Sequence, residues 1–281
     1  MLAAWAGLGY YARARNLHKC AMVVAQDYGG HFPDTVEGLL ELPGIGPYTA
    51  AAVASIAFDK PAVAVDGNVE RVVSRFYAIT EPLPLAKDDI RAGAAKLAEG
   101  VTRPGDFTQA FMELGATVCT PRNPKCVLCP WRDACTARKL GIQEELPRKL
   151  AKAVKPTRYG KVFWIENSEG RFLIHRRQGQ GLYEGLYQLP TTDWVTDKTD
   201  VAGLALPGKI KAGKPLDAEV RHSFTHFDLV LELWQGKAGK IHGMTGGEWI
   251  APEELQDYAL PTLMKKAVKL CLPPTAKKRG P

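Results

Sequence analysis

Four of the six cysteines lie within 17 residues, in the pattern C-x6-C-x2-C-x5-C. They are Cys119, Cys126, Cys129 and Cys135. Structural zinc sites usually combine two pairs of closely spaced ligands separated by a longer loop. Here one thiol follows a helix-like segment and three follow in a compact loop, which favours a [4Fe–4S] cluster over the alternative, zinc. A disulfide framework is not expected, because no secretion signal is visible.

A second group of residues suited to chemistry lies between Leu42 and Arg71. Gly44, Ile45 and Gly46 form a glycine turn between two predicted helices, and N–H groups left free at such a turn can bind a phosphate. Asp66 follows 20 residues after Gly46, between an apolar run and another predicted helix. Together they could form half of a DNA-processing site. Alternatively, the glycines serve only helix packing and Asp66 only caps its helix.

Length and charge are consistent with a two-domain protein that meets a polyanion. The chain has 281 residues, of which 46% are hydrophobic and 24% charged, and a formal net charge of +7. Residues 1–150 carry 17 Lys and Arg against 16 Asp and Glu, whereas residues 151–281 carry 20 against 14. The basic excess therefore lies in the second half. No apolar run approaches the roughly 20 residues that span a bilayer, so we expect a cytoplasmic protein.

The first half of the chain is predicted to be all-helical. Apolar residues at helical spacing predict helices over residues 2–8, 12–28, 35–42, 50–57, 68–76, 88–99 and 106–119. Tyr10 lies at the flexible joint between the first two, where its ring either packs in the core or stacks on bases. Residues 144–159 are rich in Lys and Pro, which is typical of a linker.

Alternating patterns replace the helical ones after the linker. Residues 161–166 and 171–177 predict a hairpin around a four-residue turn. Further strands are predicted at 186–190, 227–234 and 246–250, followed by a helix over 251–272 that Pro261 interrupts. These elements predict an α/β second domain.

The first domain resembles the helix-hairpin-helix DNA glycosylase superfamily, which includes the endonuclease III and MutY group. Three motifs carry the resemblance: LPGIGPYTA, VDGNVER and the four-cysteine pattern. It implies that the cysteines hold a structural [4Fe–4S] cluster, that the basic loop of Arg122, Lys125 and Arg132 docks on the DNA backbone, and that the glycine turn clamps a phosphate. We expect Tyr10 to contact the bases of the DNA.

The second domain resembles the Nudix-like fold without its catalytic box, because no carboxylate cluster of the form G-x5-E-x7-R-E-x2-E-E follows Gly185. A helical glycosylase domain followed by a Nudix-like domain is the arrangement of the adenine DNA glycosylases. The segment RHSFTHFDL resembles that family's F-S-H recognition loop, with Phe224, Thr225 in place of Ser, and His226. An ordinary strand end is the alternative for these residues.

The resemblance implies a base-excision enzyme that hydrolyses the N-glycosidic bond of adenine paired with 8-oxoguanine or guanine. Bifunctional members of the superfamily have a lysine where this chain has Tyr48, and a phenol cannot form an imine. The chain thus resembles a monofunctional glycosylase that uses water. Asp66 matches the catalytic aspartate, which would stabilise the cationic sugar. An endonuclease III-like lyase and a non-catalytic iron–sulfur DNA-binding fragment are the alternatives.

Hydrolysis also requires an acid that protonates adenine. The family uses a glutamate upstream of the G-L-G-Y-Y joint, and no glutamate of this chain has the matching motif. We therefore expect a chain that is incomplete at its N-terminus, that binds duplex DNA and that releases no adenine.

The predicted organisation is an incomplete glycosylase domain over 1–140 with its iron–sulfur loop at 119–135, a linker at 141–158, a Nudix-like 8-oxoguanine recognition domain over 159–273 and a basic tail at 274–281. The expected partner is double-stranded DNA with an A:8-oxoG or A:G mismatch. We expect a monomer without membrane association.

Overall fold

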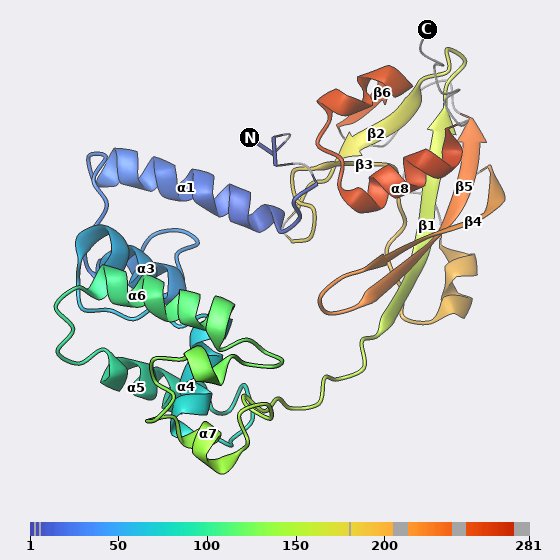
Figure 1. Ribbon diagram of the computed structural model, residues 1–281. Coiled ribbons are helices and arrows are strands. Elements are labelled where there is room, and N and C mark those ends of the chain that lie inside the picture. Colours follow the sequence, from blue (N-terminus) through green and yellow to red (C-terminus); the bar gives the residue numbers. More distant parts are fainter. Residues whose placement is uncertain (3, 6, 180, 205–212, 238–245, 273–281) are drawn as a thin grey trace, which may run out of the picture. The chain divides into compact units, whose positions relative to one another are not determined.

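The computed structural model describes residues 1–281 except 3, 6, 180, 205–212, 238–245 and 273–281. The predicted basic tail therefore lies outside the described residues. The chain divides into two compact units, Asn16–Lys152 and a second unit made of Met1–Arg15 with Ala153–Pro281 (Figure 1). Among the described residues, no helix is both long enough and apolar enough to cross a membrane.

The unit Asn16–Lys152 is helical, as predicted. Its elements are α1 (Tyr11–Asp27, which starts in the other unit), α2 (Val36–Leu40), α3 (Pro47–Phe58), α4 (Gly67–Tyr77), α5 (Lys87–Leu97), α6 (Pro104–Glu113), the π-helical turn η1 (Leu114–Val118), the 3-10 turn η2 (Cys126–Leu128) and α7 (Thr136–Leu140). One apolar cluster joins α1, α2 and α3, and a second joins α4, α5 and α6.

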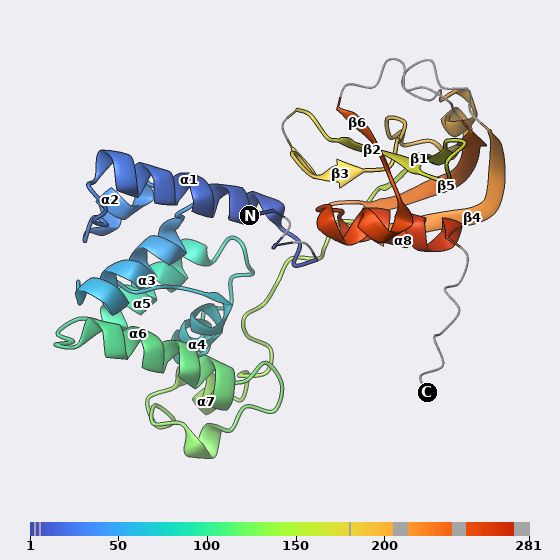
Figure 2. The same ribbon diagram turned by 90° about the horizontal axis from the view of Figure 1, so that it is seen from above.

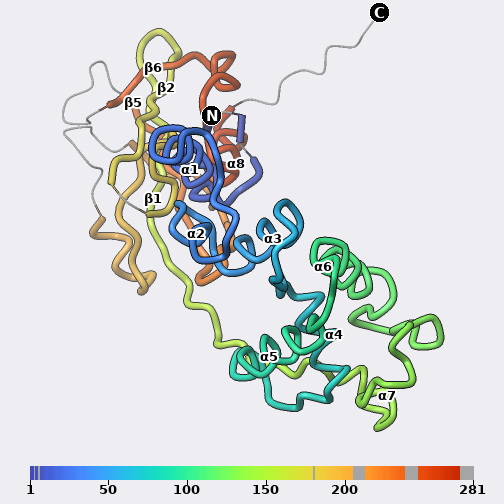
Figure 3. The backbone as a smooth tube through the Cα atoms, turned by 90° about the vertical axis from the view of Figure 1, so that its left-hand side faces the viewer, coloured from blue at the N-terminus to red at the C-terminus, as the bar shows by residue number. Residues whose placement is uncertain are grey.

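Helix α4 is at the centre of the second cluster and contacts α5, α6, η1 and α7 (Figure 3). Val69, Val72 and Val73 recur at helical spacing and are buried against α5 and α6. The opposite side of α4 carries two buried arginines, Arg71 and Arg75. This helix therefore connects the apolar core to the cysteine loop.

The other unit contains a six-stranded mixed sheet. Its strands are β1 (Thr157–Glu166), β2 (Phe172–Arg176), β3 (Tyr187–Gln188), β4 (Lys214–Ser223), β5 (Asp228–Lys237) and β6 (Gly247–Ile250). The strand order is β3-β2-β1-β5-β4, with β6 paired to β2 and with β1 parallel to β5. The 3-10 turns η3 (Lys198–Gly203) and η4 (Pro252–Asp257) precede β4 and α8 (Thr262–Cys271) respectively.

Helix α8 packs its apolar side on the sheet (Figures 1 and 2). Leu263, Met264, Ala267 and Val268 belong to the same buried cluster as the inward side chains of β1 and β5. The predicted hairpin β1–β2 and the interruption of the final helix at Pro261 are both confirmed. An α/β unit thus follows the helical one, in agreement with the sequence patterns.

The structure differs from the sequence patterns in three places. The described residues of 2–8 form turns instead of a helix, since Gly7 and Gly9 have positive φ angles of 100° and 72°. Strand β4 is an element that the patterns do not predict, because its apolar alternation is weak and most of its residues are exposed. Helical spacing puts Leu40 on the inner face of α2 with Leu39, but only Leu39 is buried.

Candidate functional site

The four clustered cysteines line a single cavity, together with Arg75 and Arg138. Cys119 ends η1, Cys126 starts η2, and Cys135 is the residue just before α7. Each of these thiols thus lies at the end of a short helical element, so the loop between η1 and α7 is anchored at both sides.

The four cysteine thiols form one electrostatically coupled group. All four face one cavity, although among the described residues no three His, Cys, Asp or Glu side chains form a site for a single metal ion. Burial raises the pKa of the Cys126 and Cys129 thiols, and the nearby sulfur of Cys119 raises these pKa values further. Four thiolates this close require a cationic group among them, which an iron–sulfur cluster supplies.

The surface of the cysteine loop is basic. Arg122 and Lys125 are exposed, and neither forms an ion pair within the part of the chain that the structure describes. Arg132, in contrast, is paired with Asp133 at 3.1 Å. The two unpaired cations are available to an anionic partner.

The two glycines of the glycine turn differ in backbone conformation and in the space around them. Gly44 has a φ angle of +79°, and a Cβ atom added there would lie 2.5 Å from Cβ of Asn16, so the fold itself requires this glycine. Gly46 is extended, with φ −98° and ψ 175°, and an added Cβ would meet no atom within 4 Å. Ile45 is half-buried against the α1–α3 cluster. The open side of the turn is therefore at Gly46, where α3 begins.

Asp66 precedes α4 and caps it. Its Oδ1 accepts hydrogen bonds from the backbone N–H groups of Asn68 and Val69, at 2.9 and 2.8 Å. Its Oδ2 accepts a hydrogen bond from the side-chain amide of Asn68, also at 2.9 Å. The capping interpretation is therefore confirmed. Capping does not exclude chemistry, because Oδ2 has a second lone pair and the bonds fix the orientation of the carboxylate.

A chain of partly buried polar contacts that sequence patterns did not reveal links Asp66 to the cysteine loop. Arg71 donates to Oδ1 of Asn68 at 2.9 Å and to the backbone oxygen of Cys119 at 2.7 Å. The i, i+3 and i, i+4 spacing of Asn68, Arg71 and Arg75 on a helix is the only sequence signal of this face. Charged residues at such positions are usually exposed, which is why the sequence patterns do not single them out.

Tyr48 lies in the first turn of α3 with 45% of its surface exposed. Its hydroxyl is 3.8 Å from Sδ of Met112 on α6. The side chain thus lies on the surface next to the glycine turn and is available to an external molecule.

Phe224, Thr225 and His226 form the turn between β4 and β5, closed by a 2.9 Å hydrogen bond from the Phe224 N–H to the backbone oxygen of Phe227. Thr225 and His226 are exposed. Phe224 is half-buried in an aromatic group, 5.8 Å from Tyr183 and 4.7 Å from Phe227 between ring centroids. These residues therefore form a closed hairpin loop, which is compatible both with an ordinary strand end and with a recognition loop.

This loop lines a cavity of about 580 Å³. The same cavity is lined by Tyr10 and Tyr11, both within the unit that contains Met1–Arg15. Tyr11 is buried, whereas Tyr10 is 71% exposed and has a φ angle of +46°. The core alternative for Tyr10 is wrong, because its ring is left at the surface beside the loop.

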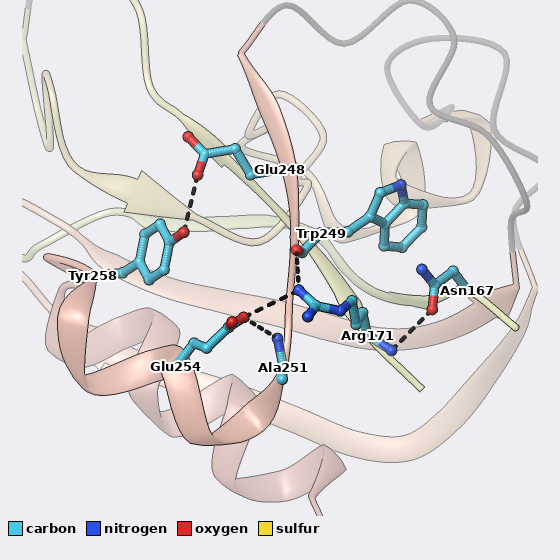
Figure 4. A network of polar contacts seen from close by, with 7 residues as sticks. All are labelled: Asn167, Arg171, Glu248, Trp249, Ala251, Glu254 and Tyr258. Atoms are coloured by element: carbon cyan, nitrogen blue, oxygen red, sulfur yellow. Dashed lines mark hydrogen bonds and ion pairs between the residues drawn. The ribbon is translucent and has the colours of Figure 1, made fainter. Parts of the chain in front are cut away.

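The glutamates of the sheet unit that Figure 4 shows serve structural contacts. Glu254 accepts from the N–H of Ala251 at 2.7 Å and from Arg171 at 3.3 Å. Glu248 accepts from Tyr258 at 3.0 Å. Both carboxylates are thus engaged in hydrogen bonds within their own unit.

Models of known protein families match segments in both halves of the chain. The NUDIX domain profile matches residues 161–270, the helix-hairpin-helix motif matches residues 27–56, and the iron-sulfur binding domain of endonuclease III matches residues 119–135. The last match identifies a [4Fe–4S] cluster in this chain, and the segment that it covers contains the four cysteines.

Adenine DNA glycosylases from distant organisms are similar to this chain over nearly its whole length. The adenine DNA glycosylase of Homo sapiens is 32% identical over 95% of this chain and 59% of its own length. The adenine DNA glycosylase of Buchnera aphidicola subsp. Schizaphis graminum is 30% identical over 96% of this chain and 79% of its own length. The chain thus spans less than two thirds of the human relative. A solved thermostable thymine-DNA glycosylase aligns with 45% of this chain and 58% of its own, at 37% identity and a TM-score of 0.41.

Proposed function

The chain belongs to the adenine DNA glycosylase family, and we propose that it acts in base-excision repair on adenine mispaired with 8-oxoguanine or guanine. The observation that carries this proposal is the Asp66 carboxylate, which is fixed at the start of α4 with one oxygen still able to face a cation. A carboxylate held in this way stabilises the positive charge that develops on deoxyribose when the base leaves.

The proposed reaction takes place on a base outside the duplex. Adenine is flipped out of the helix, and the bond between its N9 and C1′ of the sugar breaks while Asp66 balances the charge on the sugar. Water then adds to C1′ and releases one proton, which leaves a hydroxyl group on the sugar. Departure of adenine also needs a proton from an acid, a role that we assign to none of the described residues.

We propose that Tyr48 makes the reaction monofunctional, because a phenol supplies no amine for a Schiff base. Borohydride added to the protein and a duplex with an A:8-oxoG pair is expected to trap no covalent complex. Denaturing electrophoresis measures this directly, with a superfamily lyase as positive control. A trapped species that forms with this chain would favour the lyase alternative.

The glycine turn is proposed to bind a DNA phosphate through the N–H groups at the start of α3. Gly46→Ala is expected to weaken duplex binding about tenfold, because its methyl group lies where the phosphate approaches and a hydrogen bond to a charged group is lost. Folding should be unaffected, since the site is extended and sterically open. Fluorescence anisotropy and Tm measure the two effects.

Gly203→Ala, in the sheet unit and also without close neighbours, is the matched control for Gly46→Ala. Equal affinity of both variants for DNA would contradict the phosphate role of the turn.

We propose that the loop of Phe224, Thr225 and His226 recognises the 8-oxoguanine that faces the adenine. Support comes from the exposure of Thr225 and His226 beside the cavity and from the aromatic group that holds Phe224. The hydroxyl of Thr225 can donate and accept, as the family serine does.

The double variant Thr225→Ala with His226→Ala is expected to bind A:8-oxoG and A:G duplexes equally well, because the polar groups that distinguish the two purines are gone. The ratio of the two dissociation constants measures the effect, and an unchanged Tm excludes misfolding. Retention of the native ratio would show that discrimination resides elsewhere.

We further propose that the chain acts as a monomer in the cytoplasm, on the nucleoid, with the domain boundaries predicted from the sequence. Arg122 and Lys125 would contact the DNA backbone and Tyr10 the bases. The excess of basic residues supports a polyanionic partner.

A further inference from the structure

Arg75 is the most deeply buried cation of the helical unit. Only 2% of its surface is exposed. Its Nη1 lies 3.3 Å from Sγ of Cys119 and donates to the backbone oxygen of Thr120 at 2.8 Å. Its Nε and Nη2 donate to the backbone oxygens of Leu146 and Pro121, at 3.0 and 3.1 Å.

The charge of Arg75 has no carboxylate to balance it. No ion pair of Arg75 occurs among the residues that the structure describes, and its hydrogen-bond acceptors are backbone oxygens and one sulfur. A buried cation without a counter-ion is strongly unfavourable. The anionic group closest to it is the cysteine sulfur, so the balancing charge comes from the thiolates of the cluster site.

We propose that Arg75 is the internal counter-cation of the iron–sulfur cluster and a positioning residue that raises its reduction potential. A fixed positive charge stabilises the more negative, reduced form of a cluster, and a hydrogen bond to a ligand sulfur acts in the same direction. The low exposure of Arg75 keeps solvent from screening this effect. Arg75 therefore protects the cluster from oxidation.

Two other arginines near the cavity do not combine deep burial with a hydrogen bond to a cysteine sulfur. Arg71 reaches the backbone oxygen of Cys119 and no sulfur of the site. Arg138 lines the same cavity, but its side chain is 42% exposed, lies 3.9 Å from the carboxylate of Asp133 and donates to the backbone oxygen of Arg132. Arg138 thus gives a matched comparison: an exposed charge at the same site that solvent screens.

The test is protein-film voltammetry of the cluster-loaded full chain and its variants. Arg75→Gln is expected to lower the reduction potential, and to lower it more than Arg138→Gln does. Arg75→Lys keeps the charge and is expected to restore most of the native potential. Equal potentials in Arg75→Gln and Arg138→Gln would overturn the proposal. The reduction potential requires no glycosylase activity, so this outcome is independent of the proposed function.

A measurement on the native protein keeps the proposal testable if Arg75→Gln fails to fold. With ¹⁵N-labelled arginine, pulsed electron paramagnetic resonance of the paramagnetic cluster is expected to detect a coupled guanidinium nitrogen. That coupling should disappear in Arg75→Lys. Its absence from the native protein, or its persistence in Arg75→Lys, would contradict a hydrogen bond from Arg75 to the ligand sulfur.

Discussion

Replacement of Asp66 with asparagine is expected to abolish the preference of this protein for a cationic sugar in DNA. The native chain should bind a duplex with a positively charged azasugar at the adenine position about 10²-fold or more tightly than a duplex with a neutral ring there. Mimics of a transition state bind an enzyme more tightly than the substrate does by factors of this order. The amide side chain of Asp66→Asn would keep an oxygen for the N–H groups of Asn68 and Val69, so the cap and the fold should survive.

Binding to the two duplexes by fluorescence anisotropy measures this preference without requiring the complete reaction. Glu70→Gln is the matched control, because it removes a neighbouring carboxylate from the same helix. If Asp66→Asn prefers the cationic sugar as strongly as the native chain does, Asp66 is a cap and has no electrostatic role.

Loss of the iron–sulfur cluster is expected to unfold the segment between η1 and α7 and to abolish tight DNA binding. Cys126→Ala removes one ligand and leaves Arg75 and the other thiols with unbalanced charges. Binding of a structural metal contributes about 10 kcal/mol or more to folding, which is comparable to the roughly 5–15 kcal/mol total stability of a domain. The Tm of the helical unit should therefore fall sharply.

Circular dichroism and iron content should change together in this variant. Cys20→Ala is the control, because Cys20 is a buried thiol of the same unit that lies in the α1–α3 cluster, and its loss should cost only about 1 kcal/mol. A Cys126→Ala protein with native Tm and native DNA affinity would contradict the structural role of the cluster.

Local patterns in the sequence were sufficient to predict most of the fold and the grouping of the four cysteines. The apolar positions of α4, such as Val69 and Val72, repeat at helical spacing and are buried as predicted. The spacing of the four cysteines predicts one common site, and all four residues line one cavity. Such features depend on a few neighbouring residues, so they can be recognised without tertiary contacts.

Features that depend on distant contacts could not be predicted. The burial of Arg75 results from carbonyl groups 45 to 71 residues further along the chain. Strand β4 is stabilised mainly by its pairing with β5, since its own alternation is weak. The described residues of 2–8 form turns despite their apolar repeat, because Gly7 and Gly9 adopt positive φ angles.

The most direct test of the central claim compares two duplexes that differ only opposite the target base. One pairs a non-cleavable adenine analogue with 8-oxoguanine, and the other pairs the same analogue with thymine. The native chain is expected to bind the first about tenfold or more tightly, as a base pair that is specifically recognised contributes about 1–3 kcal/mol. Equal dissociation constants would contradict recognition of mispaired adenine by this protein.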